Sequence, residues 1–261
     1  RELRLHLKSC RITLVVPPCQ YASGAETAYG SQVEGVDRCL RFYSALLSDV
    51  ADCDAPCLVL HLGGDFAYSV LLSRRLRAPL YAYAARPRWG SFVEHFFIPD
   101  HSAQRRFALS KFPPDRYSQV GHLALDSVVL KETEEETRLR LGFSPQQKVL
   151  AFLTGSRPIE YCEGMPFFVK IASLVTESFL DHEVIFPMAP TVEEARLREA
   201  LDAKGVRWRG SSRIREVDLG EGRWGRVLWA LGLESIDCCR FAVAVPGTNN
   251  LQLAALYVPF L

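Results

Sequence analysis

The chain has 261 residues, of which 48% are apolar and 23% are charged, with 17 Gly and 15 Pro. This composition is that of a globular protein and excludes disordered, collagen-like and coiled-coil chains. The 31 basic and 30 acidic side chains nearly cancel, which argues against a protein that binds nucleic acid through a strong overall positive charge.

Short apolar runs alternate with amphipathic stretches, which is typical of βαβ units built on a mainly parallel sheet. In chain order, the pattern predicts strands at 12–16, 58–62, 80–84, 96–98, 117–120, 149–153, 184–186, 206–208 and 241–245. It predicts helices at 32–47, 66–75, 102–109, 167–179, 192–203 and 251–256. Residues 21–30 read as a loop, and Ser102 reads as the N-cap of its helix.

An acidic run near the middle of the chain marks a boundary between two halves. Residues 132–136 read Glu-Thr-Glu-Glu-Glu and precede Arg138 and Arg140, a pattern typical of a solvated helix. At roughly 150 residues per domain, the length corresponds to about 1.7 domains. We therefore predict an N-terminal domain at 1–126, a connector at 127–147 and a C-terminal domain at 148–261.

Eight cysteines are too few for a small secreted domain held together by disulfides, so a reducing, cytoplasmic compartment is expected. Cys53 and Cys57 form a lone pair, and Cys238 and Cys239 are adjacent, a spacing that does not predict a zinc site. No apolar run approaches the roughly 20 residues of a membrane-spanning helix. The first residue is Arg and the last five read like an unfinished strand, so we expect a piece of a longer protein.

Two loops that follow predicted strands carry groups that bind phosphate. The strand at 149–153 leads into residues 154–157, Thr-Gly-Ser-Arg, which offer a glycine, hydroxyls and a guanidinium. The strand at 241–245 leads into residues 246–249, Pro-Gly-Thr-Asn, where backbone N–H groups at a helix start are able to hold an anion. Because ligands of parallel sheets lie at the carboxyl ends of strands, we expect a phosphate-binding site there.

Each loop by itself also fits an ordinary tight turn between a strand and a helix, since such turns favour Gly, Ser, Thr and Asn. The sequence has no Gly-x-x-x-x-Gly-Lys-Ser/Thr run and no Gly-x-Gly-x-x-Gly run. It therefore does not support a P-loop NTPase or an ordinary dinucleotide-dependent dehydrogenase.

Three short blocks resemble those of one enzyme family. The blocks are residues 152–157 with Glu160, residues 245–248 at a helix start, and residues 120–122 with Asp126. In order and separation they are similar to lipid-A-disaccharide synthase and, more closely, to the lipid-A-disaccharide synthase-related proteins, over about residues 22–261. The resemblance implies an α/β fold of two Rossmann-like domains with parallel sheets that face each other across a cleft, the fold called GT-B.

The resemblance also implies an inverting, metal-independent glycosyltransferase that needs no cofactor and moves a sugar from a UDP-sugar to a lipid-linked acceptor. The residues that match the family's donor site are Gly155, Ser156, Arg157, Gly247, Thr248, Asn249 and Gln252. By the resemblance, Ser156 and Arg157 would face the donor diphosphate, and Gly247 and Thr248 would face the phosphate at the helix N-terminus. Gln252 stands where the synthase has Glu, and the family's opening Gly-Glu-rich loop has no counterpart here.

An acceptor hydroxyl needs a general base from the other domain. Asp65, which follows the predicted strand at 58–62, is the first candidate, and it also fits the N-cap of the next helix. His122 is the second candidate, although after Gly121 it also fits a hinge between domains. Glu26 is the third.

Residues 66–93 contain no acidic side chain but several arginines interleaved with aromatic residues. This pattern suits an anionic lipid surface, and single-stranded nucleic acid would use the same chemistry. It is also typical of a solvated helix face beside core aromatics. Given the resemblance, we predict contact with a lipid acceptor or the membrane surface, without nucleic acid, through Arg74, Arg75, Arg86, Arg88 and Trp89.

Two other functions stay open. An enzyme of the UDP-N-acetylglucosamine 2-epimerase type would share the fold and the donor site but would need no lipid acceptor. A non-catalytic nucleotide-binding remnant is the other, since Gln252 replaces Glu and the opening loop is absent.

Overall fold

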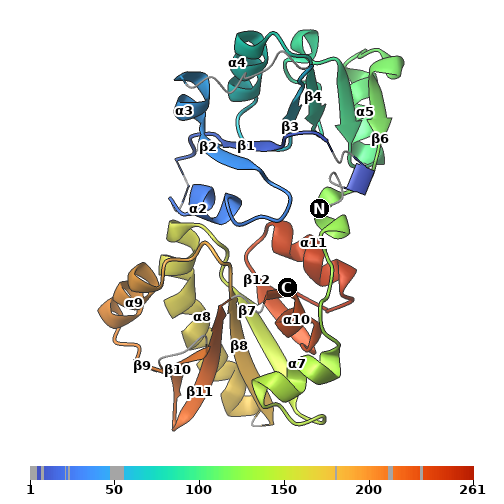
Figure 1. Cartoon of the computed structure of the whole chain (residues 1–261). Helices are drawn as coiled ribbons and strands as arrows, with labels where there is room; N and C mark the ends of the chain where they lie inside the picture. Colours follow the sequence, from blue (N-terminus) through green and yellow to red (C-terminus); the bar gives the residue numbers. More distant parts are fainter. Residues whose placement is uncertain are drawn as a thin grey trace. The chain divides into compact units, whose positions relative to one another are not determined.

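The computed structural model describes residues 5–6, 9–20, 22, 24–47, 56–179, 181–210, 214–229 and 232–261. The chain divides into two compact units, the first made of residues 1–20 and 24–123 and the second of residues 21–23 and 124–261 (Figure 1). Each unit has its own parallel strands and its own hydrophobic core.

The first unit is built on two parallel sheets. The smaller sheet pairs β1 (Thr13–Val16) with β2 (Arg38–Arg41). The larger sheet, all parallel, has the order β3 (Val59–His61), β4 (Leu80–Tyr83), β5 (His95–Ile98), β6 (Tyr117–Gln119). The helices are α2 (Glu26–Gly30), α3 (Phe42–Leu47), α4 (Phe66–Leu76), α5 (His101–Leu109) and the start of α6 (Leu123–Asp126), with 3-10 turns η1 (Gly90–Phe92) and η2 (Pro114–Arg116).

Alternating apolar residues of the larger sheet form the core of the first unit. Leu80 and Ala82 of β4 and Phe96 of β5 are buried, and they pack in one cluster with Phe66 of α4 and Phe107 of α5. The rings of Phe96 and Phe107 lie 5.1 Å apart, edge to face, a geometry that stabilises aromatic pairs beyond their buried area. Because α4 and α5 follow parallel strands, both helices begin at the carboxyl edge of this sheet.

The second unit has one six-stranded sheet of order β12-β7-β8-β11-β10-β9. The first four of these strands are mutually parallel, and β10 is antiparallel to both of its neighbours. The strands are β7 (Lys148–Leu153), β8 (His182–Met188), β9 (Trp208–Arg209), β10 (Ile214–Gly220), β11 (Arg223–Trp229) and β12 (Phe241–Ala244). The helices are α7 (Glu134–Leu141), α8 (Pro158–Ser178), α9 (Glu194–Ala203), α10 (Gly232–Asp237) and α11 (Thr248–Ala255).

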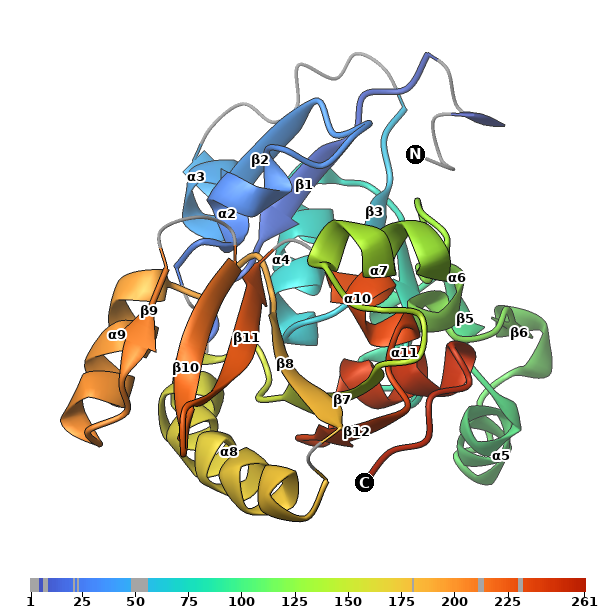
Figure 2. The same cartoon turned by 90° about the horizontal axis from the view of Figure 1, so that it is seen from below.

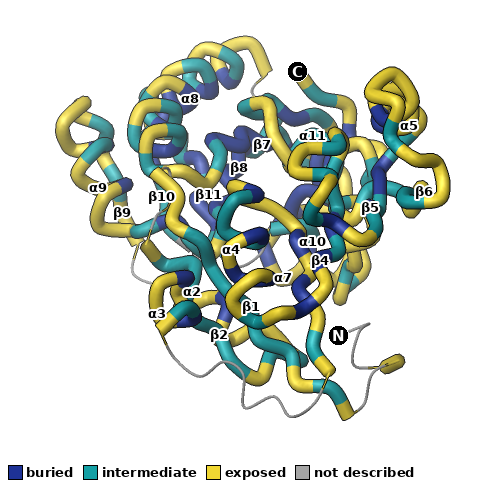
Figure 3. Tube along the Cα trace, turned by 90° about the horizontal axis from the view of Figure 1, so that it is seen from above, coloured by how far each residue is buried: buried dark blue, intermediate teal, exposed yellow. Residues whose placement is uncertain are grey.

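Helices cover both faces of this second sheet, which explains why β7 reads as a continuous apolar run. Phe152 packs on the face covered by α8 and α9, whereas Ala151 and Leu153 pack on the face covered by α7, α10 and α11 (Figure 2). Figure 3 shows β7 and β8 buried along most of their length. Within the predicted connector, α7 places Leu141 in this core and begins with a capping box at Thr133.

The structure differs from the sequence pattern between residues 21 and 47. Residues 26–30 form α2 rather than a loop, and the helix predicted at 32–47 is a loop, then β2, then the short helix α3. Pairing with β1 decides this, because the Asp37 N–H donates to Ile12 O at 2.9 Å and β2 continues the ladder. The spacing of apolar residues does not predict a tertiary contact of this kind. Here the pairing of strands outweighs the helical spacing. Residues 21 and 23 of the predicted loop lie outside the described residues.

The starts of two helices and one hairpin also differ from the prediction. Asp100, not Ser102, is the N-cap of α5, because its side chain accepts a hydrogen bond from the Ala103 N–H at 2.7 Å. α8 begins at Pro158, well before residue 167, since proline suits the first position of a helix. The β10–β11 hairpin is absent from the predicted elements, although its turn at residues 221–222 has positive φ at both positions, as tight hairpin turns do.

Two cysteines that are adjacent in the sequence are buried in the second unit. Burial raises the pKa of the Cys238 thiol to about 11, and it also raises the pKa of Cys239. Both thiols are therefore protonated at neutral pH, unlike the thiolate of an activated nucleophile. In the described part of the chain, no three His, Cys, Asp or Glu side chains gather where they could hold a metal ion. Cys53 lies outside those residues.

None of the helices that the structure describes combines the length and the apolar character that crossing a membrane requires. The last residues of the chain run beside β12, where Ala242 N donates to Pro259 O and Ala244 N to Leu261 O, each at 2.9 Å. A bridge between Ala242 and Phe260 is parallel, so this segment has the strand-like course that its sequence predicts.

Candidate functional site

The two loops predicted to bind phosphate lie side by side in the second unit. Their strands, β7 and β12, are parallel neighbours in which Leu153 is paired with Ala244, and Val245 N donates to Leu153 O at 3.0 Å. Residues 154–157 lead from β7 into α8, and residues 245–247 lead from β12 into α11. Two helix N-termini therefore begin at one sheet edge, with the seven predicted donor residues around them.

At the second loop, the start of α11 offers backbone N–H groups. Gly247 is the N-cap, and its own N–H donates to Asn250 Oδ1 at 3.3 Å. Thr248 and Asn249 follow in the first helical turn, where amides have no acceptor within the helix and the helix dipole is positive. Thr248 is exposed, and Gln252 lies four residues on, so both occupy the same face of α11.

At the first loop, a carboxylate of the chain itself occupies the helix N-terminus. Glu160 Oε2 accepts hydrogen bonds from the Ser156 and Arg157 N–H groups, each at 3.1 Å. Its other oxygen lies 3.2 Å from Arg157 Nη1, while the Arg157 side chain is 56% exposed. The sequence motif includes Glu160, but it does not indicate that this carboxylate also binds Arg157. An anion that binds at this loop therefore meets the Glu160 carboxylate as well as Arg157.

Gly155 is the one residue of the first loop that only glycine fits. Its φ is +88°, and a Cβ at this position would lie 2.3 Å from Glu160 Oε2. The preceding residue, Thr154, is buried, and its hydroxyl oxygen has no hydrogen-bond partner among the described residues. The loop thus combines a backbone conformation that favours glycine with an unsatisfied buried group, and native structures contain few such groups.

Replacing Gly155 by Ala is expected to lower the free energy of unfolding by about 1–3 kcal/mol, through the left-handed backbone and the clash with Glu160. Gly142→Ala is the matched control, because Gly142 also has a positive φ of 71° but has nothing within 4 Å of the added methyl. Urea unfolding of both variants separates the clash from the backbone cost. Equal losses would show that Glu160 moves aside without cost.

Asp65, the first candidate base, caps a helix in the first unit. It follows β3, its backbone is extended, and its side chain accepts a hydrogen bond from the Ala67 N–H at 2.9 Å. Asp65 itself is exposed. The N-cap interpretation is therefore confirmed, whereas the base role stays a prediction. His61 lies on β3 nearby, and burial lowers its pKa against the opposing effect of Asp65, which favours the neutral imidazole.

His122, the second candidate base, is paired with an acid that the sequence pattern did not single out. Its Nε2 lies 3.1 Å from Asp100 Oδ2. The Ala103 N–H lowers the pKa of Asp100 most, with a further contribution from His122. Gly121, with φ +92°, turns the chain before His122, and its carbonyl accepts a hydrogen bond from the Tyr83 hydroxyl at 3.2 Å. Asp100 and His122 lie at the carboxyl ends of neighbouring strands, a relation visible only in the fold.

The lowered pKa of Asp100 predicts a pH-dependent difference between the protein and its Asp100→Asn variant. The carboxylate contributes stability above its unfolded pKa of about 4, and this contribution is lost as pH falls through the lower folded value. Near neutral pH we therefore expect the protein to unfold at a higher denaturant concentration than the variant. The difference between the two unfolding midpoints should become smaller by about pH 3. A difference between the midpoints that grows as the pH falls would contradict the lowered pKa of Asp100.

The structure does not bring the candidate bases together. Asp65 follows β3 and His122 follows β6, the two outer strands of a four-stranded sheet. Three strand spacings separate these strands, which is about 14 Å. Glu26 lies on α2, where its carboxylate accepts a hydrogen bond from the Gly24 N–H at 3.0 Å. These side chains are therefore alternatives rather than members of one catalytic group.

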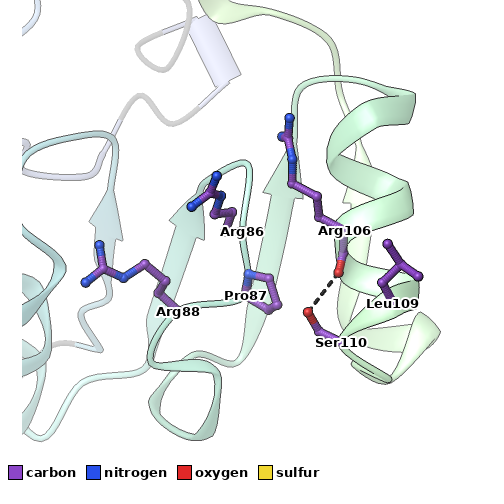
Figure 4. Close-up of a pocket in the computed structure, with 6 residues that line it drawn as sticks. All are labelled: Arg86, Pro87, Arg88, Arg106, Leu109 and Ser110. Atoms are coloured by element: carbon purple, nitrogen blue, oxygen red, sulfur yellow. Dashed lines mark hydrogen bonds between the residues drawn. The ribbon is translucent and has the colours of Figure 1, made fainter.

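The predicted basic surface falls into two parts within the first unit. The Arg74 guanidinium lies 4.7 Å from the centre of the Phe92 ring, which also contacts Trp89. Arg86 and Arg88 instead line a pocket with two residues of α5, Arg106 and Leu109 (Figure 4). Arg75 is exposed on α4. The half-buried rings among these arginines pack partly into the core, so the lipid-surface role stays a prediction.

Parts of this chain are similar to known proteins. A family model described as lipid-A-disaccharide synthetase matches residues 111–208, a stretch that includes His122 and the first donor loop. The chain is similar to lipid-A-disaccharide synthases. The synthase of Prochlorococcus marinus is 29% identical over 225 residues, which are 79% of this chain and 52% of that protein. The synthase of Syntrophus aciditrophicus is 28% identical over 147 residues, 55% of this chain and 33% of its own length.

The chain thus spans about half, or less, of the length of these curated synthases. Among solved structures, the UDP-GlcNAc 2-epimerase of Methanocaldococcus jannaschii, in complex with UDP-GlcNAc and UDP, matches with a TM-score of 0.58 at 11% identity, over 96% of this chain and 83% of that one. The UDP-GlcNAc 2-epimerase of Neisseria meningitidis, bound to UDP-GlcNAc, matches with a TM-score of 0.54 at 9% sequence identity. The match covers 97% of this chain and 82% of that one. These likenesses confirm the α/β fold of the GT-B kind with parallel sheets, and the predicted cleft between domains stays a prediction.

Proposed function

We propose that the protein is an inverting, metal-independent glycosyltransferase that moves a sugar from a UDP-sugar to a lipid-linked acceptor. The observation that supports it most is the meeting of two helix N-termini at the β7–β12 edge, in a chain similar to lipid-A-disaccharide synthases. Such an edge attracts a diphosphate, because the first amides of α11 have no acceptor within their helix and two helix dipoles are directed toward the edge. We place the protein in the cytoplasm, with contact to the membrane surface that carries its acceptor.

The donor half of the reaction requires stabilisation of the departing UDP. As the bond between the sugar C1 and the diphosphate oxygen breaks, negative charge grows on that oxygen. Arg157 and the first amides of α11 supply fixed positive charge in place of a metal ion. Thr248 adds a hydroxyl donor, and Gln252, on the same face of α11, donates a hydrogen bond to a ribose or sugar hydroxyl.

The acceptor half requires removal of a proton. An acceptor hydroxyl forms the new bond at C1 from the side opposite the diphosphate, which inverts the configuration, and a general base takes its proton. Asp65 is our first assignment, because it stands at the carboxyl edge of the first unit's sheet and is exposed. His122 is the second, oriented by Asp100.

A second candidate reaction is 2-epimerisation of UDP-N-acetylglucosamine. It is favoured by the likeness of the fold to UDP-GlcNAc 2-epimerases, with TM-scores of 0.54 and 0.58. This reaction uses the same nucleotide-sugar but no lipid acceptor. Identity of 9–11% to these enzymes, against 28–29% to the synthases, makes it the weaker candidate.

The experiment that tests the proposal offers UDP-N-acetylglucosamine with labelled sugar to the full-length protein, with and without extracted membrane lipid. Label that moves into the lipid phase supports transfer. Label that stays water-soluble as an epimerised sugar supports the second candidate. Binding without turnover would identify a non-catalytic nucleotide-binding protein, and failure to bind any uridine nucleotide would overturn the donor site.

A further inference from the structure

A pocket in the second unit lies between α8, the turn after α9 and the end of β10. Figure 2 shows the tip of β10 beside α8. The volume of the pocket is about 570 Å³, which is within the range of pockets that hold small molecules. Because β10 runs against the parallel strands, it ends at the edge of the sheet opposite to the predicted donor loops. We call this hollow the α8 pocket.

A largely exposed aromatic ring forms one wall of the α8 pocket. Phe167 of α8 is 60% exposed, whereas its neighbour Phe168 is buried in the core. Val206 and Leu219 line the same pocket and pack into the core of the second unit. A ligand that covers Phe167 removes apolar area from water, which is favourable in proportion to that area. The pocket therefore offers an apolar surface that the described residues leave open.

Two lysines that line the α8 pocket, Lys170 and Lys204, come from two helices that run in the same direction. α8 and α9 follow the parallel strands β7 and β8 and pack on one face of their sheet. The Cys162 thiol contacts Arg196 O at 3.9 Å, and each lysine stands eight residues after one of these two. Eight residues span about 12 Å of helix, so the two lysines stand at about the same height along the pocket.

The lining of the α8 pocket has one positive charge in excess. In the described part of the chain, neither Lys170 nor Lys204 has an acidic group at ion-pair distance. Arg207 and Asp218 also line the pocket, but they neutralise each other, with Arg207 Nε donating to Asp218 Oδ2 at 2.6 Å. Glu163 stands on α8 about 10 Å before Lys170. Two lysines against one glutamate leave one uncompensated positive charge.

The wall of the α8 pocket opposite Phe167 is held in place by hydrogen bonds. The Ser173 hydroxyl of α8 donates to Leu219 O. The Asp218 N–H donates to Arg207 O at 2.9 Å, and the Gly220 N–H donates to Asp218 Oδ1, also at 2.9 Å. A fixed wall loses little conformational entropy when a ligand binds against it.

We propose that the α8 pocket binds a small amphiphilic carboxylate, a molecule that joins an apolar chain or ring to one carboxylate group. The apolar part covers Phe167 and contacts Val206 and Leu219, and the carboxylate meets Lys170 and Lys204. One negative charge balances the positive charge in excess, whereas a doubly charged phosphate would exceed it. Burial of the apolar part contributes most of the affinity, because exposed ion pairs contribute little. This site does not depend on the nucleotide site of the same unit.

The test measures binding of decanoate to the full chain by titration calorimetry, below the concentration at which decanoate forms micelles. Decan-1-ol, which has the same chain without the charge, is the matched ligand. Phe167→Ala should weaken the binding of both ligands about tenfold, because an apolar contact is lost. The double variant Lys170→Gln/Lys204→Gln should weaken decanoate binding about fivefold and change decan-1-ol binding less than about twofold.

Two variants outside the α8 pocket are the matched controls. Leu174→Ala removes another apolar side chain of α8, which is 57% exposed and does not line the pocket. Lys131→Gln removes the charge of an exposed lysine elsewhere in the second unit. Each control should change decanoate binding less than about twofold. Circular dichroism of all variants checks that they fold.

Losses in the pocket variants that the controls do not share support the proposal. It is overturned if decanoate does not bind, if the controls lose as much affinity, or if the lysine variant binds decanoate as the protein does. Self-association that Phe167→Ala abolishes, measured by sedimentation velocity, would also overturn it, because a second copy would then cover the ring. UDP binding should be unchanged in the pocket variants, so failure of this pocket and failure of the donor site are distinguishable.

Discussion

The Asp65→Asn variant is expected to keep the stability of the protein while losing at least about a hundredfold of its transfer rate, the usual contribution of a general base. Asn is as good an N-cap as Asp, so the hydrogen bond from the Ala67 N–H to the side-chain oxygen survives. An amide oxygen cannot take the proton of the acceptor hydroxyl. The substitution therefore separates the two interpretations of Asp65 that the sequence leaves open.

Two further variants make the result decisive. Asp65→Ala removes cap and carboxylate together, and should also lower the free energy of unfolding by about 1 kcal/mol. Rates of lipid-phase labelling, measured with unfolding curves on the same samples, show which property changes. If Asp65→Asn retains full activity, Asp65 is a cap alone. His122→Gln then becomes the variant that should lose activity, because the two side chains follow opposite edge strands and do not form one site.

The strand–loop–helix order around the two predicted phosphate loops could be predicted because its signals are local, whereas the binding of a donor there stays a prediction. Each loop directly follows an apolar strand and opens a helix, and both strands belong to one unit. The rule that parallel strands present ligands at their carboxyl ends therefore predicts both loops at one edge of the sheet. The same rule does not indicate which strands are neighbours. That β7 and β12 pair, although about ninety residues separate them, is a property of the fold.

Contacts between elements that are far apart in the chain could not be predicted from the sequence. Asp100 and His122 pair because β5 and β6 are neighbours, and no spacing in the sequence indicates it. Arg106 of α5 lines one pocket with Arg86 and Arg88, although it lies outside the acid-free stretch that contains those two residues. Likewise, β2 forms because β1 offers its edge, against a helical pattern.

Glu160 is a different case, because its position is typical of an N-terminal cap but does not indicate which groups its carboxylate binds. An acid at the third helical position is typical of an N-terminal cap, and Pro158 marks the helix start. The structure adds that this carboxylate binds the amides and the guanidinium expected to receive the diphosphate. Any account of donor binding must therefore include Glu160.

Replacing Arg157 by Ala is expected to weaken UDP binding about 10–100-fold, the effect of losing hydrogen bonds between charged groups. The guanidinium is 56% exposed and lies 3.2 Å from Glu160 Oε1, so it is able to turn from that carboxylate to a diphosphate. Titration calorimetry with UDP measures the change. A second explanation of the same loss must be removed, because Arg157→Ala also leaves the Glu160 charge unpaired, and that charge repels the ligand.

Glu160→Gln separates these explanations, since its amide oxygen still accepts from the Ser156 and Arg157 N–H groups while the negative charge is gone. If Arg157 contacts the diphosphate, the double variant Arg157→Ala/Glu160→Gln binds UDP as weakly as Arg157→Ala. If Arg157 only neutralises Glu160, the double variant recovers most of the affinity. We expect the first outcome, because one carboxylate already capped by two amides repels an anion less than a lost guanidinium attracts it.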